Sequence, residues 1–238
     1  MKTLIIIPAY NEESNIRNVI ENIRNTCPKY DHLVVNDASK DEMLQVLINE
    51  EYNYIDLPVN LGIGGAVQSG YMYAWEKGYE IAVQMDGDGQ HDPKYLEEAI
   101  KIIEDDQADI VIGSRFIDKQ GFQTSVMRRT GIKFLSALIN LVCGVKVKDA
   151  TSGYRIVNRK YISVYSKNYA QDYPEPEAII TAKMNGAKIK EIPVVMKERL
   201  EGESSISALD GVIYMIKVSL SIIFFRLTFK KRKENRGN

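Results

Sequence analysis

Short apolar runs alternate with amphipathic stretches through the first half of the chain. Runs rich in Ile, Val and Leu predict strands at 3–7, 32–36, 52–57, 80–85 and 109–113, and the stretches between them predict helices at 12–26, 39–49, 65–77 and 93–106. Because strand and helix alternate, the pattern indicates βαβ units, and therefore an α/β fold with a mainly parallel sheet covered by helices on both faces. Ligands of such sheets bind at the carboxyl ends of the strands.

The pattern in the second half is less regular. It predicts helices at 127–143 and 175–185, and strands at 153–157 and 187–196. No internal repeat or low-complexity tract divides the chain. A single sizeable α/β domain therefore fits most of its 238 residues.

The segment 209–229 is mostly apolar but is interrupted by Lys217 and Arg226. The uncharged stretch between these two residues is too short for a membrane-spanning helix. As a helix it carries a narrow polar stripe and a broad apolar face, and basic residues crowd 230–238. These features favour a helix that lies in the plane of a membrane surface, followed by a basic tail that faces anionic lipids. The alternative is a core helix packed on the sheet.

The composition of the chain limits the ligands and the cellular compartment that we expect. The net charge is −1, which gives no indication of nucleic-acid binding, and hydrophobic residues make up 45% of the chain. Cys27 and Cys143 lie far apart and form no metal or redox motif, which fits a reducing compartment. The apolar run at 4–7 ends at Pro8 and is too short for a signal peptide. We expect a cytoplasmic protein.

Asp86 and Asp88 directly follow the predicted strand at 80–85, with Gly87 between them and Gly89 after them. Strand geometry points the two carboxylates to one side, and the glycines leave room for a bulky ligand. Carboxylates this close repel each other unless a cation joins them, and oxygen ligands with open positions suit Mg²⁺ or Mn²⁺ bound to phosphates. The alternative is an acidic turn that caps the helix at Pro93.

Two further segments end strands of the same sheet. The first contains Pro8, Tyr10 and Glu12, and Tyr10 offers an aromatic face to a base. The second contains Asp37, which can accept a hydrogen bond from a base N–H. Either segment alone is explained by strand termination and helix capping. Parallel strands, however, bring both to the edge that carries Asp86 and Asp88.

These segments resemble, in their order along the chain, the family 2 glycosyltransferases of the GT-A fold, and especially the polyprenyl-phosphate sugar synthases of the dolichol-phosphate mannosyltransferase kind. The matching segments are 8–12, 36–41, 60–64, 86–91, 113–115 and 149–155, with Arg199, Gly202, Ser204 and Ser205. The resemblance implies a GT-A domain at 1–205, a C-terminal amphipathic juxtamembrane helix with its basic tail at 206–238, and a peripheral or monotopic protein on the cytoplasmic side of the cell membrane.

The resemblance also implies roles for individual residues. Pro8, Tyr10, Glu12 and Asp37 would hold the donor nucleotide. Asp86, Asp88 and Gln90 would hold Mg²⁺ or Mn²⁺ and, through it, the diphosphate. Arg199 would reach the diphosphate, and Arg115 and Arg129 would bind the acceptor phosphate and act with Asp88 in catalysis. Arginine suits this task because its guanidinium binds phosphate through two donors. The alternative for Arg129 is an exposed basic turn beside Arg128.

The expected reaction is an inverting transfer of a hexose from a nucleotide sugar to a polyprenyl phosphate. Transfer to a hydroxyl of a lipid-linked or cell-surface glycan during cell-wall polysaccharide synthesis is the alternative, and it needs a base, for which Glu175 and Glu177 are the candidates. The chain departs from the family at Asn36, where an aspartate is usual. The sequence predicts no oligomeric state, and a homo-oligomer stays open.

Other classes of protein fit less well. A dinucleotide-dependent oxidoreductase places its glycines after the first strand, whereas Gly62, Gly64 and Gly65 follow the third. A P-loop is absent because Tyr71 and Met72 stand where Lys and Ser or Thr belong. A nucleotidylyltransferase would need a glycine-rich basic loop after the first strand. A non-catalytic binding subunit stays open, and it would bind nucleotide without turnover.

Overall fold

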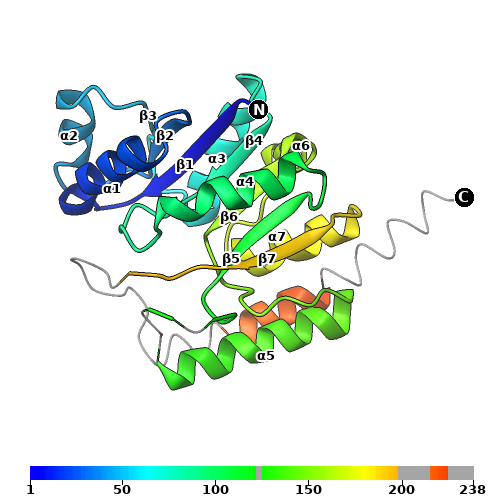
Figure 1. Cartoon of the computed structure of the whole chain (residues 1–238). Helices are drawn as coiled ribbons and strands as arrows, with labels where there is room; N and C mark the ends of the chain where they lie inside the picture. The colour runs from blue at the N-terminus through cyan, green and yellow to red at the C-terminus, as the bar shows by residue number, and fades with distance from the viewer. Residues whose placement is uncertain (119, 122–124, 198–214, 225–238) are drawn as a thin grey trace, which may run out of the picture.

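Seven strands form one sheet in the computed structural model of the protein, which describes residues 1–118, 120–121, 125–197 and 215–224 (Figure 1). The strands are β1 (Thr3–Ala9), β2 (Asp31–Asn36), β3 (Tyr54–Asp56), β4 (Ile81–Gln84), β5 (Ile110–Ser114), β6 (Arg155–Asn158) and β7 (Ile189–Pro193). The helices are α1 (Glu13–Thr26), α2 (Met43–Asn49), α3 (Gly62–Glu76), the 3₁₀ turn η1 (Pro93–Tyr95), α4 (Leu96–Glu104), α5 (Val126–Cys143), α6 (Arg159–Lys167) and α7 (Pro174–Met184).

The sheet is mainly parallel, as the sequence predicts. Its strand order is β3-β2-β1-β4-β6-β5-β7. Only β6 among these strands runs antiparallel to its neighbours, and it lies between β4 and β5. This insertion brings the segment before β6, residues 149–154, to the edge of the sheet at which β4 and β5 end.

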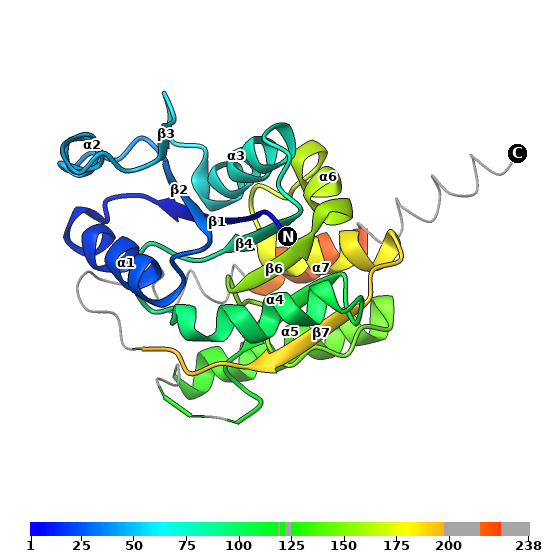
Figure 2. The ribbon, with the colours of Figure 1, turned by 45° about the horizontal axis from the view of Figure 1, so that its top comes forward.

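Strand residues face two hydrophobic cores in alternation. Leu4 and Ile6 of β1 pack under α3, α5, α6 and α7, whereas Ile5 and Ile7 pack under α1, α2 and α4 (Figure 2). This period of two, in a strand that is apolar from Leu4 to Ala9 and buried throughout, is expected for a sheet buried on both faces. The predicted helices on both faces are therefore confirmed.

Some elements differ from the expectation. Helix α2 begins at Met43 rather than at 39, because the residues before it form a turn. Helix α3 begins at Gly62, three residues before the predicted start. Helix α6 was not predicted. Pro8 does not end β1, which continues to Ala9 with Pro8 paired beside Val35 of β2.

Residues 215–224 are helical and lie beside α5 and α7 (Figure 1). Val218 and Ile222 are buried in the core under α5 and α7, and Ser221 Oγ donates a hydrogen bond to Glu177 of α7. Ile216, Leu220, Ile223 and Phe224 remain exposed. Part of the predicted interfacial helix thus packs on the domain, and the rest of 209–229 lies outside the described residues. None of the described helices is long and apolar enough to cross a bilayer.

Candidate active site

The loops that follow β1 and β2 are joined to each other by hydrogen bonds. Asn11 and Ala38 both adopt left-handed backbone conformations, with φ of 55° and 54°, so each chain turns sharply away from its strand. The Asp37 N–H donates to the Ala9 carbonyl at 2.9 Å, and the Asn11 N–H donates to Ser39 Oγ at 3.0 Å. The side chains at the two strand ends are therefore held on a common rigid support.

A hollow of about 370 Å³ opens at this carboxyl edge. Six residues with a predicted role line it, and they are Pro8, Tyr10, Glu12, Asp37, Asp86 and Asp88. They come from three segments of the chain, so the expected convergence of the β1, β2 and β4 ends is what the fold produces. The roles of the individual side chains stay predictions. The shape and the acidic lining suit a ligand that brings its own cation.

The first turn of α3 forms another wall of the hollow. Its lining residues are Asn60, Gly62, Ile63 and Ala66, and none of them had a predicted role. Asp37 fixes this turn, because its Oδ1 accepts from the Leu61 N–H at 2.7 Å and its carbonyl accepts from Asn60 Nδ2 at 3.0 Å. Backbone N–H groups at a helix start favour anions. The glycine run at 62–65 was the signal that could have revealed this wall.

Glu12 is held by a neighbour on α1. Its side chain is buried, and its Oε2 accepts a hydrogen bond from Asn15 Nδ2 at 2.7 Å. Asn15 is itself only 3% exposed. A carboxylate with one oxygen fixed by a buried amide has little freedom to rotate. Asn15 is thus a part of the site that the sequence did not indicate.

Asp86 is positioned by residues from two other parts of the chain. Its N–H donates to Nδ1 of His91 at 3.0 Å, and its Oδ2 lies 3.7 Å from His91 Nε2. A Cβ atom on Gly153 would lie 2.8 Å from the same Oδ2, so only glycine allows this approach. Burial lowers the pKa of His91 to about 4, so the ring is neutral at pH 7.

Asp86 and Asp88 fit a divalent cation, but they do not form a complete protein cage. Both are partly exposed at the same hollow. Within the described ranges, no group of three or more His, Cys, Asp or Glu side chains could hold a metal ion. Magnesium and manganese in phosphate-transfer sites take one or two carboxylates, and oxygen atoms of the substrate complete the shell. Two carboxylates in a hollow that is also lined by the start of α3 match that donor set.

Gln90 lies at the turn after the two aspartates and does not line the hollow. Its N–H donates to Asp88 Oδ1 at 3.0 Å, and its side-chain Nε2 donates to the Lys197 carbonyl at 3.2 Å. The Lys197 N–H donates back to the Gln90 carbonyl at 3.0 Å. Gln90 thus joins the aspartate loop to the chain that follows β7. Its predicted role as a metal ligand is untested.

Arg115 is tied to a buried aspartate rather than standing alone. Its Nε and Nη2 donate to Oδ2 and Oδ1 of Asp149, both at 2.7 Å, and Asp149 is fully buried. Glu191 of β7 in turn accepts from the Asp149 N–H at 2.9 Å. A forked ion pair of this kind fixes the guanidinium and offsets its charge. Asp149 is the partner that sequence reasoning missed.

Arg129 lies in the first turn of α5, which is capped by Ser125. Its side chain is half-buried, and its Nε is buried without a hydrogen-bond partner among the described residues. A buried donor without an acceptor is costly, and an anionic ligand would satisfy it. Arg199, the other predicted phosphate ligand, lies outside the described residues.

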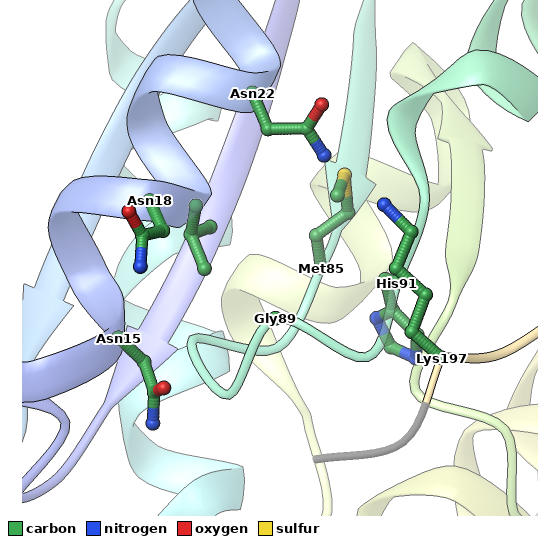
Figure 3. Close-up of a pocket in the computed structure, with 8 residues that line it drawn as sticks. Asn15, Asn18, Asn22, Met85, Gly89, His91 and Lys197 are labelled. Atoms are coloured by element: carbon green, nitrogen blue, oxygen red, sulfur yellow. The ribbon is translucent and has the colours of Figure 1, made fainter. Parts of the chain in front are cut away.

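A second hollow, of about 160 Å³, lies on the other side of the aspartate loop (Figure 3). Figure 3 shows Asn15, Asn18 and Asn22 along α1 facing His91 and Lys197, with Gly89 between them. Its lining is mostly uncharged amides and small or apolar side chains. The loop that carries Asp86 and Asp88 therefore rests on polar groups on this side.

The two candidate bases have different surroundings. Glu177 accepts a hydrogen bond from Ser221, so its carboxylate joins two helices away from the hollow. Burial raises the pKa of Glu175, and the charges of Arg155, Asp86 and Arg115 also act on it. Of the two, only Glu175 is electrostatically coupled to the candidate metal ligand Asp86.

The family described as "Glycosyl transferase family 2" matches residues 4–165. A UDP-N-acetylglucosamine–dolichyl-phosphate N-acetylglucosaminyltransferase from Methanococcus voltae is 33% identical over 80% of this chain and 83% of that protein. A polyprenol monophosphomannose synthase from Mycolicibacterium smegmatis is 29% identical over 92% of this chain and 86% of that protein. Both alignments extend well beyond the residues of the hollow.

Among solved structures, the glucosyl-3-phosphoglycerate synthase of Mycobacterium tuberculosis superposes with a TM-score of 0.68. The match covers 94% of this chain and 78% of that chain at 18% identity, and it shows a shared fold. That protein was crystallised with Mn²⁺, uridine diphosphate and phosphoglyceric acid.

Proposed function

Because the chain belongs to glycosyl transferase family 2, we propose that it transfers a sugar from a UDP- or GDP-sugar to a polyprenyl phosphate at the cytoplasmic face of a membrane. The observation that carries the proposal is the shared hollow, where Asp86 and Asp88 lie beside the aromatic, acidic and helix-start groups of β1, β2 and α3. The first relative named above is a dolichyl-phosphate sugar transferase and the second is a polyprenol monophosphomannose synthase, which supports a lipid-phosphate acceptor.

The nucleotide would occupy the β1–β2 side of the hollow. Tyr10, 40% exposed, offers its ring to the base, while Pro8 supports the loop beneath. Glu12 and Asp37 would present carboxylate oxygens to base and ribose donors. Asn15 of α1 holds Glu12, and the Leu61 N–H at the start of α3 holds Asp37. Pre-ordered acceptors reduce the entropy lost when the donor binds.

Asp86 and Asp88 would hold a Mg²⁺ or Mn²⁺ ion. For Gln90 to be the third ligand, its side-chain amide would have to release the Lys197 carbonyl and turn its Oε1 toward the ion. The solved relative with Mn²⁺ and uridine diphosphate supports this assignment. Such an ion neutralises charge on the leaving diphosphate. The start of α3 would add to this stabilisation, because Gly62 and Ile63 line the same hollow and the N-terminal end of a helix favours an anion.

The acceptor oxygen would attack the anomeric carbon from the face opposite the nucleoside diphosphate, so the C–O bond to the diphosphate breaks and the configuration inverts. A lipid phosphate is already an anion, and it needs no general base. Arg129, whose Nε has no hydrogen-bond partner among the residues that the structure describes, is the residue that would bind this phosphate directly. Arg115 would be the second ligand of this phosphate, and its ion pair with Asp149 would hold its guanidinium in one orientation.

The membrane would be contacted through apolar side chains of two neighbouring helices. Helical residues 215–224 expose Leu220 and Phe224, and α5 exposes Phe134 and Leu141. Exposed apolar residues on adjacent helices suit insertion into the lipid headgroup region, which makes the protein peripheral or monotopic. The division into a catalytic domain at 1–205 and a membrane segment at 206–238 is part of this proposal.

Transfer to a glycan hydroxyl is a second candidate, and one observation favours it. Glu175 carries a raised pKa and is coupled to the charge of Asp86, as a base near the reacting centre would be. Glu177 is the weaker candidate of the two, because it accepts a hydrogen bond from Ser221 and does not line the hollow.

A donor and acceptor screen tests the proposal. The full chain would be incubated with radiolabelled UDP- and GDP-sugars and with polyprenyl phosphate in vesicles, and we expect label in a lipid that mild acid hydrolyses. Asp88→Ala should abolish this transfer without altering the circular dichroism spectrum. Label that enters only an acid-stable glycan would support the hydroxyl acceptor, and undiminished activity of Asp88→Ala would remove the metal-site assignment.

A further inference from the structure

His91 faces one aspartate through both of its ring nitrogens. The ring is 4% exposed and stands edge-on to Tyr154, with centroids 5.1 Å apart. Its Nδ1 accepts the Asp86 N–H, so Nδ1 carries the lone pair and the proton of the neutral ring is on Nε2. The tautomer thus follows from the hydrogen bond to the main chain.

The Nε2–H group has no hydrogen-bond partner in the part of the chain that the structure describes. It lies 3.7 Å from Oδ2 of Asp86, which is too far for a hydrogen bond but within the reach of a small side-chain rotation. Gly153 lies against the same carboxylate, where a Cβ would be 2.8 Å from Oδ2 and 2.9 Å from Oδ1. Rotation of the carboxylate toward His91 would satisfy a buried donor.

We propose that His91 positions Asp86 for cation binding from two sides, with Nδ1 fixing its main chain and Nε2–H donating to Oδ2 while Oδ1 faces the cation. The inference rests on the metal site of the proposed function. Carboxylates that bind metals are themselves held by hydrogen bonds, and these partners govern affinity. An aromatic or aliphatic residue would fill the space beside Tyr154 equally well, but it would offer neither contact.

Substitutions at His91 separate the two contacts. His91→Asn keeps an acceptor for the main chain but loses the Nε2–H, His91→Gln keeps a distant N–H but loses the near acceptor, and His91→Phe loses both. We measure Mn²⁺ affinity of the full chain by electron paramagnetic resonance, without donor and then with UDP or GDP. We expect affinity to fall about 10- to 100-fold in His91→Phe and by a smaller factor in each of the other variants.

The other histidine of the chain provides the control. His32 lies on β2 and lines neither hollow, so His32→Asn should leave Mn²⁺ affinity unchanged. Wild-type affinity in His91→Asn would overturn the inference, because that variant lacks the Nε2–H. Circular dichroism and melting temperature show which variants are folded.

Nuclear magnetic resonance tests the wild-type protein, so the result does not depend on variants that fold. The chain has only two histidines, and ¹⁵N-histidine labelling therefore gives two imidazole signals, assigned with His32→Asn. We expect His91 in the Nε2–H form, with its proton shifting downfield and exchanging more slowly when Mg²⁺ is added with UDP or GDP. If Mg²⁺ shifts the amide signals of Asp86 and Asp88 but leaves the His91 signal unchanged, the role of His91 is overturned and the metal site of the proposed function stands. No shift at any of them would remove the metal site as well.

Discussion

The side-chain amide of Asn36 donates a hydrogen bond to the carboxylate of Asp56 where β2 and β3 pair, with 2.7 Å between Nδ2 and Oδ1. The same amide accepts from the Ser39 N–H through its Oδ1 at 3.2 Å. An aspartate at this position could accept from Ser39 but could not donate to Asp56. The asparagine that stands here in place of the usual aspartate is therefore explained by its hydrogen bond to Asp56 on the neighbouring strand β3.

Replacing Asn36 by Asp should destabilise the fold. Two carboxylates would then face each other across β2 and β3, and we expect the free energy of unfolding at pH 7 to fall by about 1–2 kcal/mol, measured by urea denaturation. The double variant Asn36→Asp with Asp56→Asn restores a donor and an acceptor, and it should recover most of the loss. A double variant no more stable than the single one would contradict the pairing.

Replacing Gly153 by Ala should impair catalysis through Asp86. The new methyl group would meet both carboxylate oxygens, at 2.8 and 2.9 Å, and would push the side chain out of position. We expect kcat/KM to fall at least about tenfold and the required Mn²⁺ concentration to rise. Gly131→Ala is the control, because its methyl group meets only the flexible side chain of Met215. Equal activity of the two variants would speak against the contact.

The sequence predicted the strands of this fold better than their arrangement. β1, β2, β4 and β5 are continuous apolar runs, and a strand buried on both faces is read directly from such a run. The position of β6 between β4 and β5 depends on tertiary pairing, which no local pattern encodes. Helix α6 was missed because it has only nine residues and follows β6 directly, without a loop that would separate the two patterns, although Asn158 caps it by accepting from the Tyr161 N–H.

In the candidate site, too, the residues at strand ends were predicted and the residues that hold them through tertiary contacts were not. Asp86, Asp88 and Asp37 end strands, so their convergence follows from the parallel sheet. The residues that hold them were not predicted, because their contacts join distant parts of the chain. Asp149 reaches Arg115 across 34 positions, and Gly153 reaches Asp86 only through the antiparallel insertion of β6.

Arg129→Ala should affect the acceptor far more than the donor. Its Nε lacks a partner in the described residues, and loss of a charged contact to the lipid phosphate should raise the acceptor KM by about 10-fold or more. The donor KM should change by less than about twofold. Arg128→Ala removes an exposed neighbour on the same turn and provides the matched control. Equal changes in both KM values would rule out an acceptor-specific role.

Glu175→Gln should change how stability depends on pH. Burial raises the pKa of Glu175 above its ordinary value of 4.5, so between these two values the folded state binds more protons than the unfolded state. Stability therefore falls as pH rises through this window. Melting temperatures of Glu175→Gln should decline less above pH 4.5 than those of the wild type, whereas exposed Glu21→Gln should follow the wild type. Parallel curves for Glu175→Gln and wild type would contradict the burial of an ionising carboxyl.

Two charges on the exposed face of residues 215–224 should release the protein from membranes. Leu220 and Ile223 are exposed, while Val218 and Ile222 of the same helix are buried, so Leu220→Glu with Ile223→Glu changes the outer face and spares the core. Each substitution removes an apolar side chain from the lipid surface, and we expect vesicle binding to fall at least about tenfold in a flotation assay with anionic phospholipids. Ile48 of α2 is exposed to a similar degree, and the control variant Ile48→Glu should bind vesicles as the wild type does.

Deletion of 209–238 should also abolish binding, but it removes buried Val218 and Ile222 and so disturbs the domain. Undiminished flotation of the double variant would show that another face meets the membrane.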